Sequence, residues 1–83
     1  MKMNNNLDVF IGIIARSLGV KMSDVNESLA YDDLANWDSI THMLIITELE
    51  DHFGIEFSPQ DITDSRSVLD IKERMISLGI SFD

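Results

Sequence analysis

The sequence predicts an all-α four-helix bundle with three longer helices, one short third helix, and a long loop between helices 1 and 2. Three segments place apolar residues at the spacing of one helix face, and no segment shows the sustained alternation of a strand. Three of the four glycines directly follow these segments, where helices end in a left-handed residue. The length of 83 residues suits one domain, which we expect to span residues 1–83.

The first helix is expected over residues 7–18, directly before Gly19. Its apolar stripe consists of Leu7, Phe10, Ile11, Ile14 and Leu18. Asp8 and Arg16 bracket the apolar stretch inside it, and no small-residue cleavage site follows. We therefore interpret this segment as an amphipathic helix of a cytoplasmic protein rather than a signal peptide.

The long loop, residues 20–38, contains spaced apolar residues that can tie it to the bundle. These are Val20, Val25, Leu29 and Leu34. The second helix follows, capped by Asp38 or Ser39 and ending before Gly54. Its core stripe consists of Ile45, Ile46, Leu49 and Phe53.

The last two helices have clear start signals. Ser58-Pro59-Gln60-Asp61 combines a cap, a proline at the first helical position and an acid at the third, and predicts a short helix ending near residue 64. Ser67 and Asp70 have the spacing of a capping box for the final helix. The stripe of that helix consists of Val68, Ile71, Met75 and Leu78, and Gly79 follows.

The net charge of −9 excludes several functions. It disfavours binding to nucleic-acid phosphates and anionic membranes, and no apolar run is long enough to span a bilayer. Residues 23–65 contain 11 acids and no lysine or arginine. This region is either a solvated surface that aids solubility or an electrostatic face for basic partners. The absence of cysteine excludes disulfides, thiolate metal sites and cysteine nucleophiles.

The second helix has another mixed apolar and acidic face that adjoins Ser39 on the helical wheel. Its members are Ile40, Met43, Leu44, Thr47, Glu50 and Asp51. These side chains either contact the long loop or form an exposed patch for a transient partner. In the second case, the acids steer the encounter and the apolar atoms supply affinity.

No residues suggest metal chemistry or catalysis. His42 and His52 lie about 15 Å apart along one helix and cannot share a metal within one chain, so we expect His42 to be a hydrogen-bonded or edge histidine. The acids of residues 32–38 lack the glycine and glutamate of an EF-hand. Ser39 has no base in a triad-like arrangement, so we expect no enzymatic activity.

Two segments of the sequence resemble the acyl carrier protein family, which includes peptidyl and D-alanyl carrier proteins. They are Asn36-Trp37-Asp38-Ser39-Ile40 and Leu49-Glu50-Asp51-His52-Phe53-Gly54-Ile55. The family pattern is Asp-Ser-Leu or Asp-Ser-Ile at the start of the second helix, followed by an acidic-apolar helix that ends near Phe-Gly. The resemblance extends over nearly the whole chain in length, helix order, long first loop and acidity.

This resemblance implies that Ser39 carries 4′-phosphopantetheine as a phosphodiester, and that the thiol arm holds an acyl or aminoacyl group as a thioester. A phosphopantetheinyl transferase would attach the arm from coenzyme A with Mg²⁺, and Asp38 would meet a basic residue of that transferase. The second helix would dock a loading ligase or adenylation enzyme, a synthase or an acyltransferase through basic patches. We expect a monomeric carrier.

Two positions depart from many fatty-acid carriers. Trp37 replaces a small residue, as in D-alanyl, peptidyl and specialised freestanding carriers, and Leu44 replaces a glutamate, which makes the docking face more apolar. We expect Trp37 to be a partly buried anchor for the long loop, with a role beside the arm as the other interpretation. The pathway stays open among fatty-acid, polyketide, nonribosomal-peptide and specialised lipid synthesis. The alternative function is a non-catalytic interaction domain with a carrier-like fold, in which Ser39 is an unmodified cap.

Overall fold

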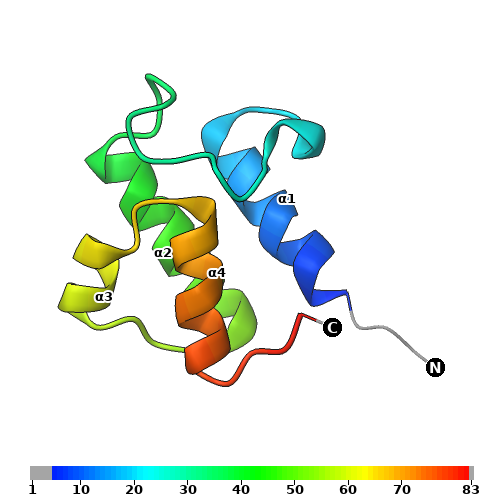
Figure 1. Cartoon of the computed structure of the whole chain (residues 1–83), viewed down its shortest axis with the longest axis vertical. Coiled ribbons are helices and arrows are strands. Elements are labelled where there is room, and N and C mark those ends of the chain that lie inside the picture. The colour runs from blue at the N-terminus through cyan, green and yellow to red at the C-terminus, as the bar shows by residue number, and fades with distance from the viewer. Residues whose placement is uncertain (1–4, 83) are drawn as a thin grey trace.

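The computed structural model describes residues 5–82, in which four α-helices and one short 3₁₀ helix surround a single core (Figure 1). The elements are α1 (Asn6–Leu18), η1 (Met22–Asp24), α2 (Ser39–Phe53), α3 (Pro59–Asp64) and α4 (Val68–Ser77). The only β-type pairing in this part of the chain is an isolated bridge between Ala30 and Ser67. The all-α prediction is confirmed. Among residues 5–82, no helix has the length and apolar character needed to cross a membrane.

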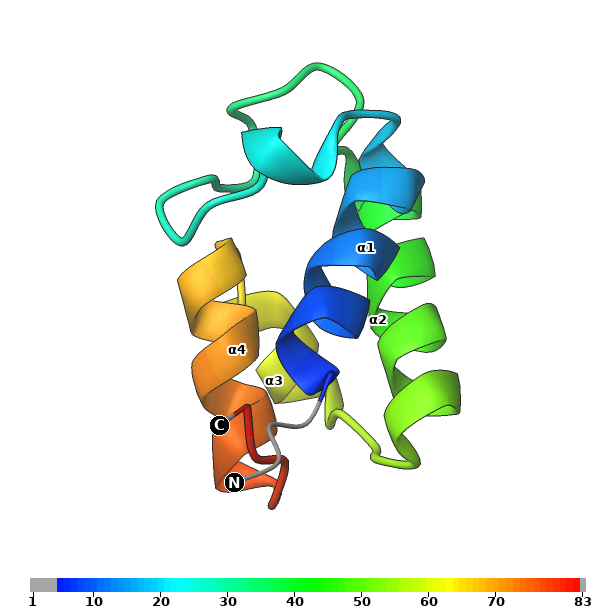
Figure 2. The same cartoon turned by 90° about the vertical axis from the view of Figure 1, so that its right-hand side faces the viewer.

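The long loop crosses one end of the bundle and returns to α2 (Figure 2). It is held by backbone hydrogen bonds to the start of α4, from Tyr31 N–H to the Arg66 carbonyl at 2.7 Å and from Val68 N–H to the Leu29 carbonyl at 2.9 Å. The side-chain amide of Asn36 donates to a carbonyl at the end of α1. As expected, four apolar residues of the loop pack against or within the core: Val20, Val25, Leu29 and Leu34.

The core forms where the apolar stripes of α1, α2 and α4 meet. The buried members of the predicted stripes are Phe10, Ile14, Leu18, Ile45, Ile46, Leu49, Val68, Ile71 and Met75. Two predicted members, Leu7 and Leu78, instead remain 36% and 38% exposed. Leu7 lies in the first turn of α1 and lines a surface hollow with Phe10 and Val68, and Leu78 lies just beyond the last residue of α4.

Residues outside the helices complete the core. Phe57, in the connection between α2 and α3, is 4% exposed. Near the C-terminus, the ring of Phe82 makes edge contacts with Phe10 and Phe53, at centroid distances of 5.3 and 6.4 Å. A single aromatic residue in a loop produces no periodic signal, so the sequence pattern does not identify these contacts.

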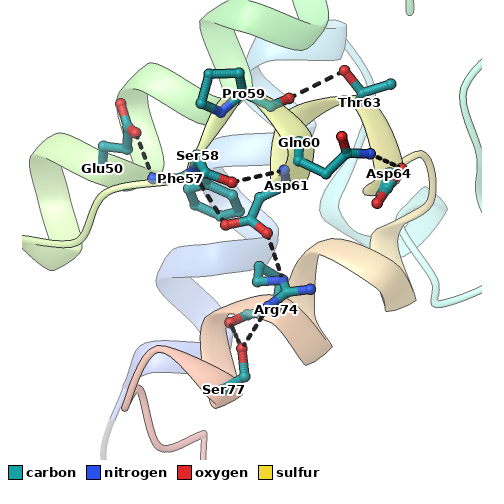
Figure 3. Close-up of polar contacts among 10 residues, drawn as sticks. All are labelled: Glu50, Phe57, Ser58, Pro59, Gln60, Asp61, Thr63, Asp64, Arg74 and Ser77. Atoms are coloured by element: carbon teal, nitrogen blue, oxygen red, sulfur yellow. Dashed lines mark hydrogen bonds and ion pairs between the residues drawn. The ribbon is translucent and has the colours of Figure 1, made fainter.

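Asp61 both caps α3 and links that helix to α4 (Figure 3). Ser58 Oγ accepts from Asp61 N–H at 3.0 Å, and an Asp61 carboxylate oxygen accepts from Ser58 N–H at 3.1 Å, which completes a capping box. The other Asp61 oxygen lies 3.1 Å from Arg74 Nε on α4. At α4 only one half of the predicted capping box forms, the bond from Asp70 N–H to Ser67 Oγ, whereas both reciprocal bonds occur at α3.

Candidate functional site

Ser39 is the first residue of α2, and its side chain is exposed. The sequence allowed either Asp38 or Ser39 as the N-cap, and the structure assigns the cap to Asp38, whose Oδ1 accepts from Thr41 N–H at 2.9 Å. The Ser39 hydroxyl is therefore not used to cap the helix. Its Oγ lies 3.0 Å from the hydroxyl of Tyr31, in the long loop.

The capping bond changes the acidity of Asp38. The backbone N–H of Thr41 stabilises the ionised carboxylate and holds the pKa of Asp38 below its usual 3.8. A carboxyl group with a lowered pKa in the folded state stabilises the fold above its unfolded-state pKa. That contribution is lost as the pH falls through 3.8 toward the lowered value.

We expect Asp38→Asn to lose this pH dependence, because asparagine can cap the helix but does not titrate. The wild type should be more stable than the variant near neutral pH, and its advantage should shrink as the pH falls below 3.8. Urea unfolding of both proteins across this pH range measures the difference. A stability difference that stays constant with pH would contradict the capping account.

A surface pocket of about 190 Å³ opens beside Ser39. Its lining comes from the long loop, α2, α3 and the connection before α4: Tyr31, Ser39, His42, Met43, Ile62, Thr63 and Arg66. The Arg66 guanidinium lies over the Tyr31 ring, 4.1 Å from its centroid. Four chain segments therefore meet around the serine at the start of α2.

Two buried aromatic residues, Trp37 and His42, lie next to this pocket at the start of α2. Trp37 Nε1 donates to His42 Nδ1 at 3.0 Å, and His42 Nε2 lies 3.1 Å from the Ile62 carbonyl of α3. Both contacts are satisfied when His42 carries its proton on Nε2. The expectation of a hydrogen-bonded histidine is confirmed, and Trp37, at 1% exposed, is more deeply buried than expected.

The two histidines differ in their exposure to solvent. His42 is buried at the start of α2, whereas His52 is exposed near its end and contacts the Phe53 ring. Across residues 5–82, no group of three or more histidine, aspartate or glutamate side chains is arranged to hold a metal ion.

The predicted docking face of α2 is largely exposed. Ile40, Met43 and Leu44 have 82%, 45% and 47% of their surface accessible, so the long loop does not cover them. Thr47 and Asp51 are also exposed.

Glu50 differs from the other members of this face, because its carboxylate accepts from Phe57 N–H at 2.8 Å (Figure 3). This bond holds the connection between α2 and α3. The structure thus gives Glu50 a role within the fold, which helical spacing alone does not reveal.

Comparison with known proteins identifies the family of this chain. The family model described as "Phosphopantetheine attachment site" matches residues 8–75, so the chain is a phosphopantetheine-binding domain over most of its length. The acyl carrier protein of Chlamydia caviae is 39% identical over 59 residues, which cover 71% of this chain and 77% of that protein. The acyl carrier protein of Chlamydia felis is 39% identical over 59 residues, or 71% and 76% of the two chains. The chain belongs to the acyl carrier protein family.

Family membership defines the general role of the molecule. The phosphopantetheine-binding domain of acyl carrier proteins carries covalently attached 4′-phosphopantetheine, so this group is the cofactor. The chain is a carrier rather than an enzyme. Proteins of this family interact with synthases and transferases in general.

Proposed function

We propose that Ser39 carries 4′-phosphopantetheine as a phosphodiester, and that the chain presents an acyl or aminoacyl thioester to partner enzymes. The pathways that fit are fatty-acid, polyketide, nonribosomal-peptide and specialised lipid synthesis. The observation that carries this proposal is that Asp38 and Ser39 have different roles at the start of α2. Asp38 caps the helix, which leaves the Ser39 hydroxyl exposed beside a pocket and accessible for modification.

The residues around Ser39 fit the chemistry of the group. The positive end of the α2 dipole favours a phosphate at its first residue. Tyr31 and Arg66 add a hydroxyl and a cation to the adjoining pocket. When bound, the group supplies the thiol on which an acyl chain is carried, and this explains how a chain without cysteine can form a thioester.

We assign partner recognition to the exposed residues near Ser39. Ile40, Met43 and Leu44 supply apolar contact area, and Asp51 and the other acids of residues 23–65 attract basic partners. Asp38 adjoins the modified serine and presents a carboxylate to the transferase. We include in this proposal a single domain over residues 1–83 that works as a monomer in the cytoplasm.

Intact mass spectrometry tests the carrier function. Incubation with a broad-specificity phosphopantetheinyl transferase, coenzyme A and Mg²⁺ should add one phosphopantetheine to the wild-type protein. A reference carrier in the same mixture shows that the transferase is active. An unchanged mass for this chain beside a modified reference would contradict the proposal and favour the interaction-domain alternative.

Ile40→Asp is expected to slow this modification by about tenfold in kcat/KM, because an exposed apolar contact at the centre of an interface contributes more than 1 kcal/mol. Ile76→Asp is the matched control, since Ile76 is 50% exposed on α4 and lies outside the docking face. Added salt should slow the modification of all three proteins by screening the acidic surface. Equal rates for the two variants would remove Ile40 from the docking surface.

A further inference from the structure

Arg66 has an unusual setting in this acidic protein. It is the first basic residue after the stretch of residues 23–65, which contains no lysine or arginine. Three of the other described cations form ion pairs, as Lys72 does with Glu27 at 3.0 Å and Arg74 with Asp61 at 3.1 Å. The guanidinium of Arg66 instead rests on the Tyr31 ring, at 4.1 Å from the centroid. Stacking orients a guanidinium and leaves its N–H groups available to an anion.

Tyr31 connects this cation to the serine. Its hydroxyl lies 3.0 Å from Ser39 Oγ, and all three residues line the same pocket. The position of Tyr31 is set by its backbone, because its N–H donates to the Arg66 carbonyl at 2.7 Å. The long loop is therefore hydrogen-bonded to the connection before α4 at the place where Tyr31, Arg66 and Ser39 are neighbours.

We propose that Arg66 and Tyr31 bind the phosphodiester that modification places on Ser39, an inference that rests on the proposed function. Arg66 is the counterion of the phosphate, and Tyr31 is its neutral hydrogen-bond donor. This pair adds a built anion site to the start of α2 and orients the first segment of the arm along the pocket.

The chemistry of the modified serine supports both roles. In the unmodified protein, either hydroxyl of the Tyr31–Ser39 pair can donate. Once Ser39 Oγ becomes an ester oxygen, the serine has no proton to give, so Tyr31 must donate to the ester or phosphate oxygens. A phosphodiester carries one negative charge and several acceptor oxygens, which match the planar N–H fork of arginine.

Two NMR measurements on the wild-type protein test the proposal, before and after modification is confirmed by intact mass. The side-chain N–H resonances of Arg66 should shift on modification, whereas those of Arg74, which is paired with Asp61, should stay in place. The ³¹P resonance of modified wild type should differ from that of modified Arg66→Gln. Modified Ser39 with Arg66 resonances that move no more than those of Arg74 would overturn the inference.

Urea unfolding provides an independent readout. The effect of modification on the folding equilibrium constant should be about two- to fivefold more favourable in wild type than in Arg66→Gln, the range of an exposed ion pair. Lys21→Gln removes the same charge outside the pocket and should behave like wild type. Equal effects in both variants would overturn the inference. An unmodified wild-type protein would instead refute the underlying carrier function, so the two failures are distinguishable.

Discussion

Replacing Ser39 by alanine is expected to abolish incorporation of phosphopantetheine while changing the free energy of unfolding by less than about 0.5 kcal/mol. The loss of modification follows because the phosphodiester has no oxygen on which to form. The small effect on stability follows because Asp38, rather than Ser39, caps α2. Alanine is also well suited to a helix, and within residues 5–82 the side-chain bond that is lost is an exposed one to Tyr31. Intact mass and urea unfolding measure the two effects separately.

Ser67→Ala is the matched control, because it should give the opposite pattern. Ser67 Oγ accepts from Asp70 N–H at 3.0 Å and caps α4, so its removal should lower the free energy of unfolding by about 1 kcal/mol. Modification should persist at the wild-type level. A Ser39→Ala protein that still gains the mass of phosphopantetheine would contradict the assignment of the site.

Trp37→Ala is expected to be the most destabilising single change, lowering the free energy of unfolding by about 3–5 kcal/mol. The indole is 1% exposed, and its removal leaves a large cavity where the long loop enters α2. A domain of this size has a total stability of about 5–10 kcal/mol, so this loss is a large fraction of the total. Circular dichroism during urea unfolding measures the loss.

Trp37→Phe separates packing from hydrogen bonding. Phenylalanine keeps most of the ring volume but removes the N–H that donates to His42 Nδ1. A buried acceptor without a partner costs about 1–3 kcal/mol, so this variant should lie between wild type and Trp37→Ala. A Trp37→Phe protein as stable as wild type would show that the Trp37–His42 bond contributes nothing to the fold.

Helical periodicity and capping chemistry predicted most of this fold because both are local signals. Gly19 and Gly54 adopt the left-handed conformation expected of residues that end helices, with φ of 71° and 67°. The start of α3 follows directly from Ser58 and Pro59. Whether a side chain of a helical stripe is buried depends in addition on which other elements pack against it. Leu78 continues the stripe of α4, yet it lies beyond the last residue of that helix and remains 38% exposed.

The candidate site could be predicted only in part. The residues at 38 and 39 are adjacent in sequence, so they form a recognisable family motif. The helical wheel identifies the second face of α2, but only the structure shows that its apolar residues are exposed. Tyr31 and Arg66 are 35 positions apart and reach Ser39 only through the packing of the loop on the start of α4. Glu50 has a contact that helical spacing did not predict, because its carboxylate accepts from the backbone N–H of Phe57.

The identity of the modified residue is the most direct test of this account. The wild-type protein should be modified in vitro, digested, and fragmented in the mass spectrometer so that phosphopantetheine is localised to one residue. We expect the group on Ser39 alone, the exposed serine at the first position of α2. Phosphopantetheine found on any other residue would contradict the central claim that the start of α2 is the attachment site.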